Sequence, residues 1–332
     1  MTVDSAGMFI VSLDFELYWG VHDHVRLPEY AANLQGVHTV VPKILSLFEQ
    51  YGIHATWATV GFLFLDSLRA LQDHVPTIQP AYTDPTLNPY TKLAMLASID
   101  PQLLFASQLI ERILAVPHQE IGTHTFSHYY CLEAEQCSAA FCTDLAMAIT
   151  VARKQNLVLE SMVFPRNQIN QSDLTSCFEY GIRTYRGTEQ HWMYRSRPAQ
   201  QQTLFIRFWR LLDAYFNLTS HHCSTPAAIA AHKPYNIPAS RFLRPYNPHL
   251  EWLEPFRLRR ITSSMAYAAR HGKVFHLWWH PHNFGIHQNK NLAVLRHILE
   301  HYTTLQQAYG FQSRHMAEVA NYIERHQNEY GD

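Results

Sequence analysis

The sequence predicts an α/β protein with a parallel β-sheet, arranged either as a barrel or as a doubly wound sheet. Short apolar runs alternate with helical patterns along the 332-residue chain, which is the order that parallel sheets require. Hydrophobic residues make up 47% and charged residues 16%, so a large core can form. No P-loop, G-x-G-x-x-G or G-x-S-x-G motif is present, which argues against NTPase, dinucleotide-binding and serine-hydrolase functions.

In the first half of the chain, buried strands and capped helices follow one another. Expected strands are residues 8–15, 54–64 and 119–125, and expected helices are residues 39–52 and 100–117. The strands are short apolar runs, whereas the helices show apolar residues at helical spacing. Gly52 stops the first helix, and Asp100 followed by Pro101 starts the second.

The second half repeats this alternation. Expected helices are residues 133–156, 254–272 and 290–310, and expected strands are residues 157–165, 182–187 and 273–279. Gly272 ends a helix directly before the last apolar strand. Active sites of both candidate architectures gather at the carboxyl ends of the strands, so polar residues at those ends are the candidates for function.

We expect one domain spanning residues 1–332, with two segments that interrupt the alternation. Residues 72–100 are rich in Pro, Thr and Asp, and residues 188–250 are rich in aromatics, Arg and His. Both are expected to be insertions that cover or shape a cleft. Neither composition nor repeats mark a further domain boundary.

Charge and hydropathy indicate a small-molecule partner. The net charge is -1, so no global field favours nucleic acid. No apolar stretch is long enough for a membrane span. No Lys or Arg precedes Arg26, and the first apolar run contains acids, so we expect no secretory signal and a cytoplasmic location. The sequence leaves open whether the chain forms a homo-oligomer.

The first strand ends in two carboxylates. Asp14 and Glu16 are two residues apart, so in a strand they share a face while Phe15 points into the wall. Two buried carboxylates on one face repel each other unless a cation or a shared proton separates them. A metal ion would resolve this conflict. The alternative is that the strand ends at Leu13 and both acids are solvated.

Histidines follow two further strands. His124 and His128 are four residues apart, a spacing that places two imidazoles on one helix face and is typical of H-x-x-x-H zinc sites. With one carboxylate they form a metal site with open positions for water and substrate. A chance pair is the alternative, because the chain has 22 histidines. His280, in HLWWHPHNFG, suits an acid–base role, and the HPH tripeptide is a less favoured metal site.

The motifs SLDFE, ATWATVG, EIGTHTFSH, FPRN and FHLWWHPHNFG occur in this order, and with them the chain resembles the polysaccharide deacetylase family, also called NodB-homology domains or carbohydrate esterase family four. The resemblance covers most of the chain outside the two insertions. It implies a distorted (β/α) barrel of about seven strands. It also implies a divalent metal ion, held by one carboxylate and two histidines, that serves the hydrolysis of N- or O-acetyl groups.

Carried over to this sequence, the resemblance assigns a role to each candidate residue. The metal ligands are Glu16, His124 and His128; the base is Asp14, the acid is His280, the residue paired with the base is Arg166, and the oxyanion donor is a backbone N–H near Asn167. The expected metal is zinc, with manganese, cobalt or iron as alternatives. The chain departs from the common pattern in its Asp-Phe-Glu first motif and in the place of its FPRN arginine, and no aspartate matches the one that orients the acid.

We therefore expect a metal-dependent hydrolase that removes an N-acetyl group from a sugar or glycan precursor. A metal ion would lower the pKa of a water molecule, Asp14 would accept a proton and His280 would protonate the departing amine. Alternatives on the same fold are hydrolysis of another linear amide or of an O-acetyl ester. A glycosidase that uses Asp14 and Glu16, and a barrel that binds glycans without turnover, also remain open.

Overall fold

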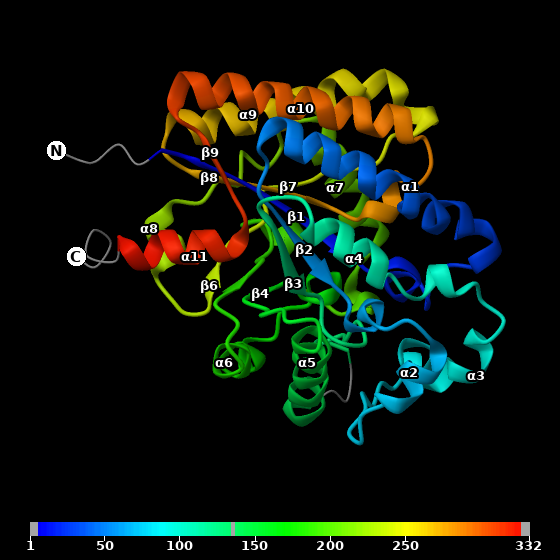
Figure 1. Ribbon diagram of the computed structural model, residues 1–332. Helices are drawn as coiled ribbons and strands as arrows, with labels where there is room; N and C mark the ends of the chain where they lie inside the picture. Colours follow the sequence, from blue (N-terminus) through cyan, green and yellow to red (C-terminus); the bar gives the residue numbers. More distant parts are fainter. Residues whose placement is uncertain (1–5, 134–136, 327–332) are drawn as a thin grey trace.

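A computed structural model of the chain describes residues 6–133 and 137–326, and Figure 1 shows a central sheet surrounded by helices. All strand pairs of the sheet are parallel, in the order β6-β5-β4-β3-β2-β1-β8-β7, and β9 pairs with β1. The strands are β1 Met8–Phe15, β2 Ala55–Thr59, β3 Gln119–Thr123, β4 Ser161–Met162, β5 Thr184–Tyr185, β6 Tyr235–Asn236, β7 Arg241–Phe242, β8 Val274–Trp279 and β9 Gln312–Arg314.

One short segment connects the two outer edges of the curled sheet. β6 pairs with β5, and the N–H of Ala239 donates to the carbonyl of Gly187 at 2.9 Å. One residue later, the N–H of Ser240 donates to the carbonyl of His276 at 2.8 Å, and β7 then pairs with β8. The expected distorted (β/α) barrel is therefore confirmed, although the described residues form nine strands and not about seven. β6 and β7, which both lie within the expected insertion 188–250, belong to the sheet.

Helices cover the outside of this barrel. They are α1 Leu27–Tyr51, α2 Leu68–Asp73, α3 Leu93–Leu96, α4 Ser107–Leu114, α5 Ser138–Arg153, α6 Gln171–Glu179, α7 Leu204–Tyr215, α8 Pro226–Ala230, α9 Glu254–Arg270, α10 Gln288–Tyr309 and α11 Met316–Arg325. In Figure 1, α1, α9 and α10 lie together on one side of the sheet, and α9 contacts β1 and β8. Within the described ranges, no helix has the length and apolarity to cross a bilayer.

The helix boundaries differ from the expected ones where proline and short turns act. α1 begins twelve residues earlier than expected, with Pro28 in its first turn, a position where proline needs no hydrogen-bond partner. The expected helix 100–117 is a 3₁₀ turn, Pro101–Leu103, followed by α4. Part of the expected helix 133–156 falls on residues 134–136, outside the described residues. β9 and α11 were not predicted.

β1 forms the centre of the core. All eight of its residues are buried, and it pairs with β2, β8 and β9. Phe15 packs edge-on against Trp57 of β2, with ring centroids 6.2 Å apart. A strand that is buried on both faces reads as a continuous apolar run, which explains why β1 was recognisable from sequence.

Two glycines allow α1 to contact the turn that follows β8. A Cβ on Gly36 would lie 2.0 Å from the carbonyl oxygen of Gly285, and a Cβ on Gly285 would lie 1.9 Å from the carbonyl oxygen of Asn33. The side chain of Asn33 also donates to the carbonyl of His282 at 3.2 Å. This close approach fixes the position of the turn that carries the two histidines of HPH.

We expect Gly285→Ala to lower the free energy of unfolding by about 2 kcal/mol or more, because the new methyl group must displace the backbone of α1. Its φ of −60° suits alanine, so the effect isolates packing from backbone strain. Ser46→Ala on the exposed face of α1 is the control and should change stability by about 0.5 kcal/mol or less. Equal urea denaturation midpoints for the two variants would contradict the packing account.

Candidate metal centre and catalytic site

The two acids of the first motif lie buried at the carboxyl end of β1. Asp14 is the penultimate residue of the strand and Glu16 follows it, with relative exposures of 3% and 4%. β1 extends to Phe15, so the alternative of two solvated acids beyond Leu13 does not hold. Buried carboxylates need compensating partners, and each of the two has its own set.

The imidazoles of His124 and His128 face one oxygen of Glu16. Their Nε2 atoms lie 3.3 and 3.1 Å from Oε2, and all three side chains are buried. Nδ1 of His124 lies 2.8 Å from the carbonyl of Val163, which only accepts, so Nδ1 carries the proton. The neutral ring thus turns an Nε2 lone pair toward a carboxylate oxygen. A cation between them, a proton or a metal ion, removes the repulsion, and the three groups fit a metal site.

These histidines lie on a loop and not on the helical turn that their spacing indicated. Thr125 and His128 have φ values of +62° and +60°, in the left-handed region. Asp144 of α5 holds the loop by accepting the N–H of Phe126 at 2.6 Å, and it also binds Ser127. Such backbone conformations persist only where surrounding contacts stabilise them, so α5 fixes the two imidazoles in place.

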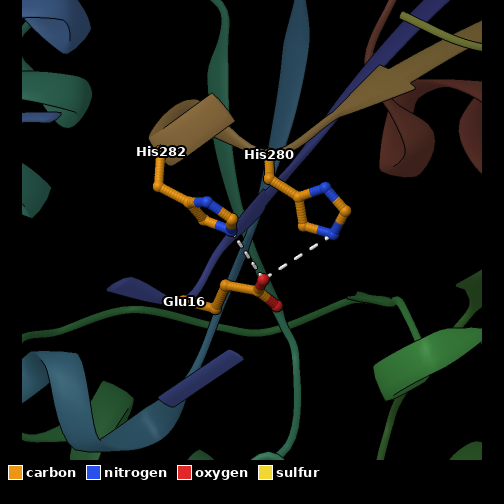
Figure 2. Close-up of side chains that lie close together, drawn as sticks. All are labelled: Glu16, His280 and His282. Atoms are coloured by element: carbon orange, nitrogen blue, oxygen red, sulfur yellow. Dashed lines mark hydrogen bonds and ion pairs between the residues drawn. The ribbon is translucent and has the colours of Figure 1, made fainter. Parts of the chain in front are cut away.

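The turn after β8 brings two more imidazoles to the same carboxylate, as Figure 2 shows. Nε2 of His282 lies 3.0 Å from Oε1 of Glu16, and Nε2 of His280 lies 3.6 Å from the same oxygen. Glu16, His280 and His282 therefore form a second group of metal-ligating atoms. Burial raises and the surrounding histidines lower the pKa of Glu16, which ends well below its ordinary value.

Asn283 contacts His280 and indicates which ring nitrogen of this histidine carries the proton. Its amide nitrogen contacts Nδ1 of His280 at 3.2 Å, and because an amide nitrogen only donates, the neutral His280 ring carries its proton on Nε2. The Tyr30 hydroxyl donates to the amide oxygen of Asn283 at 3.3 Å and lies 2.7 Å from Nδ1 of His282. His280 thus directs an N–H toward Asp14 and Glu16, and Asn283 contacts the other ring nitrogen of this histidine, for which the sequence offered no aspartate partner.

Arg186, which the sequence analysis did not single out, pairs with Asp14. Its two terminal nitrogens donate to the two Asp14 oxygens at 2.6 and 2.8 Å, and its guanidinium stacks on Trp278 at 4.0 Å from the ring centroid. Burial raises the pKa of Asp14, but the charge and hydrogen bonds of Arg186 lower it below the ordinary value. A sequence signal existed, because Arg186 directly follows β5.

Arg166 does not take the place expected for it. Its guanidinium pairs with Asp23 and lies 4.2 Å from the ring centroid of Tyr130, and within residues 6–133 and 137–326 it forms no hydrogen bond or ion pair with Asp14. The expected pairing with Asp14 is therefore corrected to Arg186. β4 and β5 are neighbouring two-residue strands, and each is followed closely by an arginine, so only the packing decides which arginine points inward.

Asn167 lies at the site, but its backbone N–H is not free to bind an oxyanion. This N–H donates to the carbonyl of Phe164 at 2.9 Å. The side-chain oxygen of Asn167 accepts from Arg186 at 3.0 Å, which leaves its amide nitrogen as the available donor. The backbone N–H of Asn167 is therefore already used within the turn, contrary to the expectation of a backbone oxyanion donor at this residue.

A cavity of ≈ 380 Å³ opens onto these groups, and we call it the catalytic cavity. It is lined by Asp14, Glu16, Gly20, Val21, His24, Val25, Tyr30, His128, Arg166, Asn167, Trp278, His280, His282 and Asn283. Burial lowers the pKa of His128 to about 4, and burial also lowers the pKa of His280. Both rings are therefore neutral at pH 7, the form in which imidazole binds a metal ion.

Asp144 should make stability depend on pH. Burial raises its pKa to about 6 from 3.8, so the folded protein holds this proton more tightly than the unfolded chain does. The resulting stabilisation is present below about pH 4 and is lost as the pH rises through about 6. Relative to Asp144→Asn, the native protein should lose up to about 3 kcal/mol of unfolding free energy between pH 4 and 7. A pH-independent difference in urea denaturation would contradict this.

Comparisons with known proteins identify the fold. No family model and no curated protein matches the chain. Among solved structures, a protein from Mycobacterium smegmatis assigned to the polysaccharide deacetylases is 11% identical with a TM-score of 0.61, covering 98% of this chain and 93% of its own. Puue allantoinase is 13% identical with a TM-score of 0.56, covering 99% and 93% of the two chains.

A third structure, from Pseudomonas aeruginosa PAO1 and likewise assigned to the polysaccharide deacetylases, is 12% identical with a TM-score of 0.53 and covers 96% of this chain and 90% of its own. Identities this low establish the fold and not the reaction. The chain therefore has the α/β fold of the polysaccharide deacetylases, the NodB-type barrel.

Proposed function

We propose that this protein is a metal-dependent hydrolase that removes an N-acetyl group from a sugar or glycan precursor. The observation that carries the proposal is the grouping of an ionised, arginine-paired Asp14 with a Glu16 that is surrounded by imidazoles, at the carboxyl end of the central strand. Hydrolysis of an amide requires a base, a group that polarises the carbonyl and an N–H donor. One cavity holds a carboxylate, a set of possible metal ligands and an N–H donor for these three tasks.

Glu16, His124 and His128 are the proposed ligands of one divalent ion, with zinc as the first candidate. The ligand set of two imidazoles and one carboxylate suits zinc and also manganese, cobalt or iron. The His280 and His282 group is the weaker candidate, because Nε2 of His280 carries a proton in its neutral form. When bound, the ion would polarise the substrate carbonyl and acidify a water molecule.

Asp14 is the proposed base. Its pKa lies below the ordinary range, so it is ionised at neutral pH and can accept a proton. Arg186 orients the carboxylate by contacting both of its oxygens, and Asn167 braces Arg186 from the other side. This arrangement also argues against a glycosidase, which needs one carboxyl group with a raised pKa as its acid, whereas the pKa values of Asp14 and Glu16 are both lowered.

His280 is the proposed acid residue: its Nε2–H faces the leaving amine, and the proton that Asp14 takes from the water molecule is passed on to this amine, so the imidazole ends the reaction neutral, as it began. Its Nε2–H faces the space between Asp14 and Glu16, at 3.6 Å from an oxygen of each. The amide nitrogen of Asn167 is the proposed donor to the oxyanion. Hydrolysis of another linear amide or of an O-acetyl ester would use the same groups, so identification of the released product separates these reactions.

The protein, purified without added metal, should contain about one equivalent of a transition metal, and the His124→Ala, His128→Ala double variant should lack it. Metal content per chain is measured by mass spectrometry. The matched control is His232→Ala, His249→Ala, which removes two exposed histidines and should retain the metal. A native protein that binds none of zinc, manganese, cobalt or iron would sink the proposal.

His280→Ala should lower acetate release from an N-acetylated sugar by about 10²–10⁴-fold while the metal content is unchanged, because the variant loses a proton donor and not a ligand. Acetate release and metal content are measured on the same preparation. Loss of metal together with activity would show instead that His280 is a ligand. If the native protein binds the sugar but releases no acetate, and His280→Ala binds the sugar equally well, the results would favour a non-catalytic glycan-binding barrel.

A further inference from the structure

A second cavity, of ≈ 220 Å³, adjoins the catalytic cavity, and we call it the arginine cavity. Its lining residues are Arg166, Asn167, Glu189, Tyr194, Arg195, Ser196, Gln202, Arg210, Ala214, Arg241, Phe242, Arg244 and Trp278. Arg166, Asn167 and Trp278 line both cavities. A substrate whose scissile group lies near Asp14 can therefore extend into this second space.

Three guanidinium groups of the arginine cavity lack an acidic partner. Arg195 and Arg244 form no side-chain hydrogen bond or salt bridge with the part of the chain that the structure describes, and Arg210 donates only to the carbonyl of Met193, at 2.8 Å through Nε. Burial lowers the pKa values of Arg210 and Arg244, and the charge of Glu189 offsets this lowering for Arg210 only in part, so both charges are held partly away from water. Such an arrangement is costly unless an anion binds there.

The other charges of this lining do not remove the excess. Arg241 is paired with Asp213 at 2.9 Å, and Arg166 is paired with Asp23, neither of which lines this cavity. Glu189 is the acidic residue among the lining residues. Arg195, Arg210 and Arg244 carry three positive charges, and Glu189 carries one negative charge. The lining of the arginine cavity therefore has an excess of two positive charges.

Buried polar atoms in the same wall also lack partners. Nε of Arg241, a residue that is 5% exposed, and Oε1 of Gln202 have no hydrogen-bond partner within the described ranges. One is a donor and the other an acceptor, and native proteins seldom leave such atoms unsatisfied. The wall of the arginine cavity therefore contains polar groups that the described part of the chain does not pair.

We propose that the arginine cavity binds a phosphate or diphosphate group of the substrate, so that the acetylated sugar is presented as a phosphate ester. This inference rests on the proposed deacetylase function. Guanidinium forks bind phosphate oxygens through paired, charge-assisted hydrogen bonds, and a phosphate matches an excess of two charges, whereas a carboxylate matches one. Phe242, Trp278 and Tyr194 supply aromatic surface for the neighbouring ring.

The unpaired arginines of the arginine cavity come from a different part of the sequence than the proposed catalytic groups. Arg195, Arg210 and Arg244 all come from residues 188–250, the stretch expected to be an insertion that shapes a cleft. The proposed catalytic groups lie at or just after the ends of β1, β3, β4, β5 and β8. The strand ends thus supply the chemistry, and this stretch supplies recognition of the anionic part of the substrate.

The test is calorimetric titration of the chelator-treated, metal-free protein with inorganic pyrophosphate, inorganic phosphate and glucuronate. Metal-free protein excludes binding of the anion to a metal ion. Pyrophosphate should bind, and the Arg210→Gln, Arg244→Gln double variant should weaken its affinity by at least about tenfold, because each variant removes charge-assisted hydrogen bonds. Arg259→Gln, which removes an exposed arginine of α9 outside the lining, is the matched control and should bind as the native protein does.

Arg195→Gln provides a second variant, since Arg195 is exposed and has no partner to lose, and it should weaken binding without affecting thermal unfolding. No pyrophosphate binding, or equal affinity in the double variant and the control, would overturn the proposal. Glucuronate binding as tight as pyrophosphate binding would overturn the phosphate assignment. Because neither metal content nor acetate release enters this titration, the result is independent of the proposed reaction.

Discussion

The arrangement of the whole site depends on the burial of two carboxylates on one strand. Asp14 and Glu16 lie at the end of β1, a strand whose residues are all buried, where little of either side chain is exposed to water. Each charge therefore needs protein partners, and the sheet order provides them because β8 is the direct neighbour of β1 and β3 lies one strand beyond β2. Asp14 is compensated by Arg186, whereas Glu16 is surrounded by imidazoles that are neutral where burial lowers their pKa. This difference in compensation is the basis for proposing Asp14 as the base and Glu16 as the metal ligand.

The segment that closes the barrel links the strands of the proposed catalytic site to the wall of the arginine cavity. The segment that runs from β6 to β7 bonds to β5 on one side and to β8 on the other, so it holds together the strands that present Arg186 and His280. The same segment carries Arg241 into the wall of the arginine cavity. Sheet hydrogen bonds thus fix the position of Arg241 relative to the strands that present Arg186 and His280. A rigid scaffold of this kind suits a substrate with two chemically different ends.

Local sequence patterns could not decide which of several similar residues faces the site. Arg166 and Arg186 both follow short strands, and only the packing of Trp278 and the position of Asp14 select Arg186. The spacing of His124 and His128 indicated a helix, but the hydrogen bonds that Asp144 offers to the loop stabilise left-handed backbone there instead. Such contacts join residues far apart in sequence, so periodicity does not report them.

The sequence by itself determined the α/β class, the central strand and most residues of the candidate site. It could do so because a fully buried strand must be apolar, and because polar residues at the end of such a strand stand out against it. Only the tertiary structure decided that Asp14 pairs with Arg186, that His282 joins the site, and that unpaired arginines of residues 188–250 gather beside it. Charge compensation is a property of groups brought together in space, and spacing along the chain does not encode it.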